Sequence, residues 1–451
     1  MVRLILLETR LLLRDRRALA LIFVLIAACL LAIASGRALM ADQIDGRTAS
    51  AAEDREALDG FRKRLNNPGL PPEEAILSPY RMRVGIMAPP PPLADFSAGR
   101  AAFDNYSTVA TMRSRPDTLF KRTQTDNPET LMRGRIDLGF VAVIIAPLLL
   151  IGLAYGLFAA DRDSGTARLI MVQAGSARRL VAARLVPRFV IVALPIALTA
   201  LGLLVTGPDM GGRWGAAGWW VLIALLLLLA WTAAIAWVNS LRITAETAAL
   251  ALVAGWAVLT LVLPAAVSAA VQAAYPPPSR FEQIASARAA EVASTEAYEN
   301  DHPDLAADDA AGRLASIRKT WSIAQRVDAA VAPLNARFDA QLAAQQRFAA
   351  ALSWLSPAMI AGTAMEQAAG TDAGTAREFR TATRDYLARF LAFGGGFVER
   401  GETMDARDFA AIPRFAWQPN VTPPWAAMLA LALIALLFLT AAFRRYGRAE
   451  L

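Results

Sequence analysis

The chain has 451 residues, of which 56% are hydrophobic and 19% are charged, and its formal net charge is +7. The apolar residues are gathered in runs of roughly 20, the length at which a helix crosses about 30 Å of hydrocarbon, so we expect a multi-pass membrane protein rather than a soluble one. The single cysteine, Cys29, and the single histidine, His302, exclude an intrachain disulfide, a cysteine metal cluster and a multi-histidine metal site.

Residues 1–17 are expected to form an amphipathic helix that lies in the cytoplasmic interface of the membrane. Its arginines are spaced by seven, four and three residues, which places them on one helical face, while leucines fall on another. A cleaved signal peptide is the alternative, but the apolar run that follows is longer than the roughly 7–15 residues of a signal sequence. The arginines on this face are Arg3, Arg10, Arg14 and Arg17.

Six apolar stretches are expected to cross the membrane as helices, because backbone polar groups in lipid must be satisfied within the segment. Three of the stretches contain a proline, Pro147, Pro195 or Pro264, which predicts local kinks. The stretches are 18–36, 138–160, 189–207, 219–239, 247–271 and 424–443.

Arginine clusters predict the orientation of these spans. They precede the first span, fill residues 161–188 and recur after the last span in residues 444–451, and with six crossings all of them lie on one face. The positive-inside rule makes that face cytoplasmic, so both termini are expected in the cytoplasm. The position of the clusters beside apolar runs favours contact with anionic lipid and predicts no nucleic-acid binding.

Two long segments, residues 39–137 and 272–423, are left on the opposite side of the membrane. Periodicity predicts one or two long helices in residues 279–353 and a further helix in 375–393, whereas Gly394–Gly396 is expected to be a turn. The predicted fold is therefore an all-α membrane protein with six transmembrane helices and a mostly helical extracytoplasmic domain built from two insertions. Binding of a partner or cargo and a purely structural role both remain open for that domain.

The sequence contains no energy source of its own. The six stretches hold no Asp, Glu, Lys, Arg or His, the residues with which ion-coupled carriers bind their coupling ion. A P-loop needs G-x-x-x-x-G-K-[ST], and the only lysine directly followed by Ser or Thr, Lys319, follows Arg318. We therefore expect no catalytic residue, cofactor or metal here; if ATP drives the protein, a separate ATPase chain hydrolyses it.

The cytoplasmic stretch 161–188 is the candidate coupling site. It opens with acids on both sides of Arg162, continues with Gly165, which permits a sharp reorientation, and then predicts a short helix capped by Asp163 or Ser164. An ordinary cytoplasmic hairpin that obeys the positive-inside rule is the alternative, and the residues alone leave both interpretations open.

The sequence ADRDSGTARLIMVQAGSARRLVAAR, residues 160–184, resembles the first cytoplasmic loop of type-2 ABC exporter permeases. In that family an acid-rich turn, a Gly-Thr step, a short helix and a Ser-Arg step form the coupling helix. The chain departs from the family at Ala174-Gly175, where a proline is frequent, and at Arg184, where a lysine is common. The resemblance implies that an ATPase docks on Asp161, Arg162, Asp163, Gly165, Thr166, Arg168, Ser176, Arg178 and Arg179.

Further stretches are similar to a bacterial subfamily of these permeases with two large extracytoplasmic segments. The resemblance implies the permease subunit of an ABC exporter in the bacterial inner membrane, paired with a second permease chain and a separate P-loop ATPase; it implies no particular cargo. Two other classes remain open: a non-transporting scaffold or sensor whose extracytoplasmic helices bind a ligand or partner, and an intramembrane enzyme, although paired acids at membrane depth are missing. The similar stretches are residues 88–106, 127–141, 355–372 and 412–420.

Overall fold

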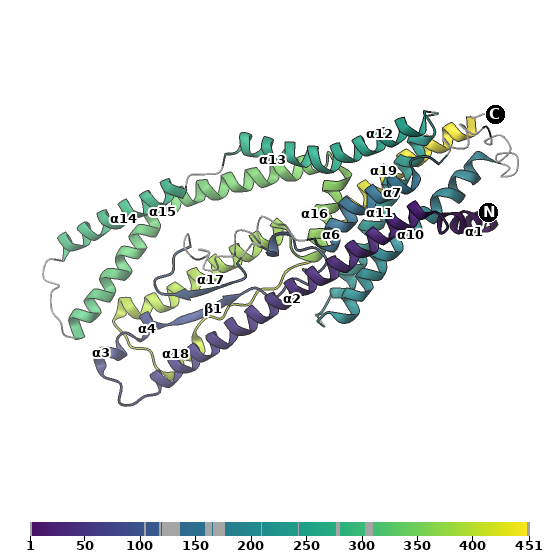
Figure 1. Cartoon of the computed structure of the whole chain (residues 1–451). Helices are drawn as coiled ribbons and strands as arrows, with labels where there is room; N and C mark the ends of the chain where they lie inside the picture. The colour runs from purple at the N-terminus through teal and green to yellow at the C-terminus, as the bar shows by residue number, and fades with distance from the viewer. Residues whose placement is uncertain are drawn as a thin grey trace.

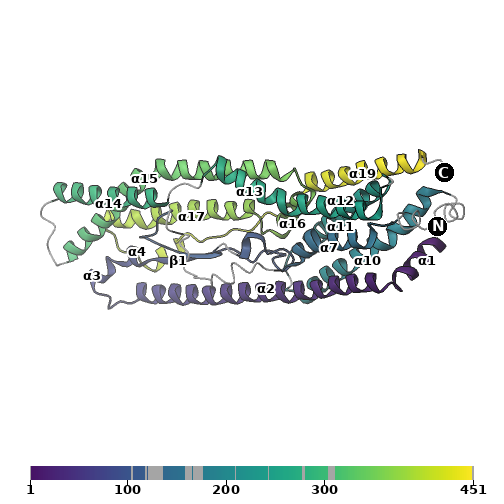
Figure 2. The ribbon, with the colours of Figure 1, turned by 45° about the horizontal axis from the view of Figure 1, so that its top comes forward.

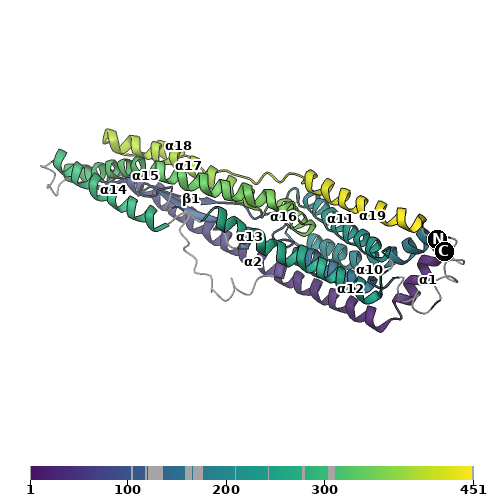
Figure 3. The same cartoon turned by 90° about the horizontal axis from the view of Figure 1, so that it is seen from above.

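The molecule is elongated, with a bundle of apolar helices at one end and a head of more polar helices at the other (Figures 1, 2 and 3). The first helix, α1 (Val2–Leu12), and the last, α19 (Trp425–Arg448), both reach the outer end of the bundle, so the two termini lie near each other. The computed structural model describes residues 2–102, 105–116, 119, 136–157, 165, 176–208, 210–241, 243–276, 280–302 and 310–448.

Five helices in the described part of the chain are long and apolar enough to cross a membrane. The protein is therefore a helical membrane protein of the multi-pass type, and these helices correspond to five of the six predicted spans. They are α2 (Arg16–Leu65), α10 (Ala177–Thr206), α11 (Arg213–Asn239), the continuous helix α12–η3–α13 (Ala245–Ala257, Val258–Val262 and Leu263–Ala274) and α19.

The predicted second span is a shorter apolar helix at the centre of the bundle. It consists of α6 (Leu138–Phe140), η2 (Val141–Ile145) and α7 (Ala146–Ala154), followed by a turn at residues 155–157. Leu138 and Leu150 are fully buried in the core that this helix shares with α2, α10 and α11. Residues 158–160, which complete the predicted span, lie outside the described residues, so six crossings stay a prediction.

Two of the three prolines inside predicted spans mark a change of helix type. Pro147 and Pro264 each lie in the first turn of an α-helix that follows a π-helical turn, η2 or η3. Proline cannot donate the next backbone hydrogen bond and crowds the preceding turn, and the wider π turn accommodates that defect. Pro195 lies inside α10, where its carbonyl accepts a hydrogen bond of 2.7 Å from Thr199 Oγ1.

The N-terminal part differs from the expectation for residues 1–17. The amphipathic helix α1 ends at Leu12, and Asp15 Oδ1 accepts a hydrogen bond of 3.0 Å from the Arg17 N–H, which caps α2. Residues 16 and 17 therefore begin the first span. This helix then continues without a break to Leu65, so one rod joins the bundle to the head (Figure 1). At the other terminus, residues 444–448 of the predicted tail are the last turns of α19.

The head combines elements from both predicted insertions. The expected helices in residues 279–353 are confirmed as α14 and α15, and the one in 375–393 lies within α17. An antiparallel strand pair, which the sequence did not indicate, aligns Arg83 with Thr111 and Met87 with Ser107. The elements are α3 (Pro72–Ala75), α4 (Ser78–Arg81), β1 (Arg83–Met87), η1 (Gly99–Ala102), β2 (Ser107–Thr111), α14 (Arg280–Asp301), α15 (Ala310–Ser353), α16 (Pro357–Ala369), α17 (Ala373–Arg400) and α18 (Ala406–Ala411).

One buried core holds the head together. From the first insertion it receives Phe61 at the far end of α2 and Ile86 of β1; from the second it receives Trp321 of α15 and Tyr386 and Phe390 of α17. Large aromatic side chains bury the most apolar area per residue and prefer tilted or edge-to-face contacts, as between the Tyr386 and Phe390 rings, whose centroids are 6.0 Å apart. The two insertions therefore share one hydrophobic core.

The expectation of a turn at Gly394–Gly396 is wrong, because all three glycines lie inside α17. A Cβ atom on Gly394 would overlap Met112 Sδ, and a Cβ on Gly395 would overlap the Trp321 ring. Glycine is therefore selected here by close packing of neighbouring elements against the helix, and not by a left-handed backbone conformation.

Candidate functional site

The loop between α7 and α10 contains the predicted docking residues, and the structure describes four of them. Gly165 has a φ of +73°, a left-handed conformation that glycine adopts without strain; the expected reorientation of the chain around it lies outside the described residues. Ser176 precedes α10, and Arg178 and Arg179 lie in its first turn. The other predicted docking residues lie outside the described residues: Asp161, Arg162, Asp163, Thr166 and Arg168.

The end of this loop is helical earlier than expected. Ser176 Oγ accepts a hydrogen bond of 3.3 Å from the Arg179 N–H, an N-cap that starts α10 at Ala177. Residues 177–188, predicted as loop, are therefore the first three turns of the helix. Arg178 Nε donates to the Phe443 carbonyl at 3.1 Å, so this predicted docking residue connects α10 to α19. Arg178 and Arg179 are both exposed.

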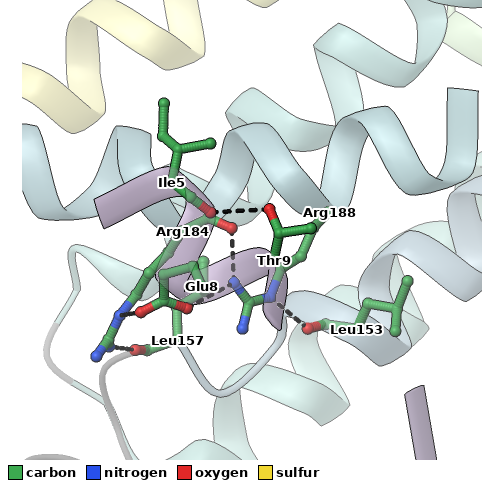
Figure 4. A network of polar contacts seen from close by, with 7 residues as sticks. All are labelled: Ile5, Glu8, Thr9, Leu153, Leu157, Arg184 and Arg188. Carbon is green, nitrogen blue, oxygen red and sulfur yellow. Dashed lines mark hydrogen bonds and ion pairs between the residues drawn. The ribbon is translucent and has the colours of Figure 1, made fainter. Parts of the chain in front are cut away.

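A mostly buried ion-pair network joins the end of α7 and the first turns of α10, the two helices that flank the loop, to α1 (Figure 4). Glu8 of α1 lies 3.1 Å from Arg184 Nε and 3.5 Å from Arg188 Nη1, and the three side chains are only 11–15% exposed. Arg184 also donates to the Leu157 carbonyl, and Arg188 donates to the Leu153 carbonyl at 2.8 Å. Glu8 thereby holds two arginines that each bind the chain where it leaves α7.

Two more hydrogen bonds connect the helices around this ion-pair network to the rest of the bundle. Asn239 Nδ2 at the end of α11 donates to the Ala154 carbonyl at 3.4 Å, and Tyr446 Oη of α19 donates to the Ala236 carbonyl at 3.1 Å. These bonds connect the end of α7 to α10 and α11, and α11 to α19.

We expect Glu8→Gln to destabilise the protein by about 1–3 kcal/mol, because it leaves two mostly buried guanidinium groups without their carboxylate. The measurement is denaturant unfolding of the chain in nanodiscs. Glu246→Gln, which changes an exposed acid in the first turn of α12, is the matched control and should shift the free energy of unfolding by less than about 0.5 kcal/mol. Equal effects of the two variants would show that the network adds nothing.

A second polar centre lies where α10 and α11 meet the head. Arg213, the first residue of α11, is 2% exposed and forms an ion pair with Asp95, whose side chain is also 2% exposed. Its guanidinium donates further to the Pro92 carbonyl at 2.6 Å and to the Leu203 carbonyl of α10 at 3.1 Å. One arginine thus fastens residues 92–98, which we name the hub segment, to two spans.

The hub segment also contacts the short central helix and the second insertion. The Asp137 carboxylate accepts a hydrogen bond of 2.8 Å from the Ala98 N–H and caps α6 through the Phe140 N–H at 2.7 Å. Thr371 Oγ1 donates to the Ser97 carbonyl at 3.0 Å. The hub segment therefore couples the head mechanically to the same spans that carry the loop at their opposite ends.

A small cavity of about 170 Å³ beside the hub segment holds two acids, Asp137 and Glu366. Burial, together with the neighbouring Asp137 and Asp372 charges, raises the pKa of Glu366 to about 7. Burial also raises the pKa of Asp137. With a pKa near 7, the Glu366 carboxyl group exchanges its proton near neutral pH.

The stability of the protein is therefore expected to fall as pH rises from about 5 to about 7. Between these values the unfolded chain has already released the Glu366 proton while the folded chain retains it, so rising pH favours the unfolded state. The expected loss is on the order of 2 kcal/mol, since part of the side chain stays exposed. Melting temperatures at several pH values test this: Glu366→Gln should flatten the slope, and an unchanged slope would contradict it.

The polar groups described above are bound mainly to one another and to backbone carbonyls. They contain no group of three or more His, Cys, Asp or Glu side chains placed to hold a metal ion. The polar groups at both ends of α10 and α11 are engaged in ion pairs and backbone hydrogen bonds. Such an arrangement is suited to transmitting displacement between the loop and the head.

Residues 269–418 match a family described as a domain of unknown function (DUF3526). The match begins in α13 and extends through α14, α15, α16, α17 and α18, so it covers most of the second insertion and leaves the loop outside. A comparison with curated protein sequences finds no match. The description of the family names no activity.

Proposed function

We propose that this chain is the membrane-spanning permease subunit of an ABC exporter whose ATP is hydrolysed by a separate ATPase chain. The observation that carries the proposal is the Glu8–Arg184–Arg188 network, which joins the two helices that flank the loop, α7 and α10, to α1. The resemblance of residues 160–184 to a permease coupling loop and the lack of a P-loop motif in the sequence support it.

In this proposal the ATPase docks on residues 161–179 at the cytoplasmic side of a bacterial inner membrane, where both termini also lie. Closure of two ATPase chains moves the loops of two permease chains. Because Arg184 and Arg188 bond the end of α7 to α10, this movement shifts those helices and, through Arg213, the hub segment. The shift requires that the ATPase binds the loop with different free energies in the two states of the permease.

The decisive experiment is co-purification of the ATPase with the charge-reversal variant Asp161→Arg/Asp163→Arg. Arginines in place of the two acids repel the cationic partner that an acidic turn would select, so we expect the ATPase to be lost while the permease remains folded. Glu246→Arg, which reverses the charge of an exposed acid in the first turn of α12, is the control and should retain the ATPase.

Two outcomes would contradict the proposal at different levels. Retention of the ATPase and of its stimulated turnover by the double variant would show that the docking site is wrong. If the wild-type chain, purified from its native membrane, carries no P-loop ATPase at all, the permease assignment fails, and a scaffold or sensor whose head binds a ligand becomes the better interpretation.

A further inference from the structure

The head contains a cavity of about 440 Å³ beside the N-terminus of α17. It is lined by elements from both insertions: Arg47 of α2, the proline segment that follows β1, Arg100 of η1, the start of α17, and the extended residues Trp417 and Pro419 before α19. Its volume falls within the roughly 300–1,000 Å³ of small-molecule sites. The cavity lies away from the loop and takes no part in the proposed docking.

The charged residues that line this cavity are mainly cationic. Among the described lining residues, three are arginines, Arg47, Arg100 and Arg380, and one is an acid, Asp372. Asp372 is already engaged as the N-cap of α17, where its carboxylate accepts hydrogen bonds of 2.7 Å from the Gly374 N–H and 2.6 Å from Thr375 Oγ1. The positive end of the α17 dipole faces the same region, so the cavity favours a negative charge.

Arg47 is the most constrained of the three arginines. It is 6% exposed, its Nε donates to the Ala88 carbonyl and its Nη1 to the Gln43 carbonyl, both at 2.9 Å, and its guanidinium carbon lies 4.1 Å from the centre of the Tyr106 ring. Nη2 has no hydrogen-bond partner in the described part of the chain. Burial lowers the pKa of Arg47 to about 10, so it stays charged at neutral pH, and it lines the cavity without an ion pair to any described carboxylate.

The rest of the wall combines apolar and aromatic side chains with the neutral polar residues Asn105, Thr371 and Thr375. Tyr106, Phe379 and Trp417 contribute rings, with those of Phe379 and Trp417 5.3 Å apart between centroids, and Pro89 and Pro91 contribute a rigid edge. A site with a cationic end and an aromatic wall matches a ligand that combines an oxyanion with an apolar body.

We propose that this cavity binds a small organic anion, with its carboxylate or phosphate on Arg47, Arg100 and Arg380 and its apolar body against Tyr106, Phe379 and Trp417. A buried guanidinium without a counter-charge is costly, and an oxyanion in the cavity removes that cost. The site gives the head a binding role in addition to its structural one.

Binding is tested on the full chain in nanodiscs by calorimetry with water-soluble probes. They are 4-phenylbutyrate, 4-phenylbutyl phosphate, inorganic phosphate and the neutral 4-phenylbutanol. We expect at least one of the two phenylbutyl anions to bind about tenfold or more tightly than the alcohol and than inorganic phosphate. The anion that binds more tightly shows whether the site prefers a carboxylate or a phosphate. Failure of both anions to exceed the alcohol overturns the proposal.

Variants then locate the site. Arg380→Gln and Arg100→Gln should each raise the dissociation constant of the preferred anion by about tenfold, and the melting temperature of each variant shows whether it is folded. Arg377→Gln, an exposed arginine on α17 outside the cavity, should leave it unchanged. The two cavity variants are independent, so either one that folds decides the question, and equal weakening by Arg377→Gln would overturn the site. No ATPase is needed, so this result and that of the docking test are separable.

Discussion

Arg213→Leu is expected to destabilise the protein by about 3–5 kcal/mol, because it leaves the Asp95 carboxylate buried without a counter-charge. The same change removes the hydrogen bonds to Pro92 and Leu203, so it also releases the hub segment from α10. Denaturant unfolding of the chain in nanodiscs measures the loss. Arg62→Leu, which breaks an exposed pair with Asp59, should cost less than about 1 kcal/mol.

The double variant Asp95→Leu/Arg213→Leu separates charge from packing. Removing both partners of a buried pair is often neutral or stabilising, and here Asp95 Oδ1 and Arg213 Nε lack hydrogen-bond partners among the described residues. We therefore expect the double variant to recover most of the stability that Arg213→Leu loses. A double variant as unstable as the single one would show that the loss comes from the backbone contacts and not from the unpaired carboxylate.

The apolar spans could be predicted from the sequence, because about 20 uncharged residues leave a chain few alternatives to a membrane helix. The continuation of α2 to Leu65 could not be placed, since residues 37–65 are polar enough to read as a separate segment. Gly36 lies inside α2 and does not end the helix; a glycine is needed there because the Asp95 carbonyl packs where a side chain would be. That contact is made by a residue 59 positions away and is invisible locally.

The Glu8–Arg184–Arg188 network could be predicted only in part from the sequence. Arg184 and Arg188 are four residues apart and so share a helical face, which the sequence does indicate, but their partner Glu8 lies 176 residues before Arg184. From the sequence alone, Arg213 is indistinguishable from any arginine at the end of a membrane span; only the fold places Asp95 beside it. Pairings between distant segments follow from tertiary packing, and a single sequence carries no local signal for them.

The glycine run shows the opposite failure, in which a local rule misled. Glycine is a poor helix former, and three in succession normally indicate a turn. In α17 the apolar residues on either side continue the helical pattern, and Trp321 and Met112 occupy the space that side chains at Gly395 and Gly394 would need. Packing of the head core therefore outweighs the propensity cost.

Gly395→Leu is expected to destabilise the head by about 3 kcal/mol, because its side chain would have to displace the Trp321 ring from a well-packed core. Trp321 is 6% exposed and donates from Nε1 to Glu399 Oε1 at 3.1 Å, so it has little freedom to move. Gly396→Ala, on the adjacent residue, meets only the flexible end of Arg400 at 3.1 Å, and should stabilise the helix by up to about 1 kcal/mol. Denaturant unfolding measures both variants, and close packing requires that Gly395→Leu lowers the free energy of unfolding while Gly396→Ala raises it. Destabilisation by both variants would instead indicate that α17 needs a flexible or turn-like segment at this point.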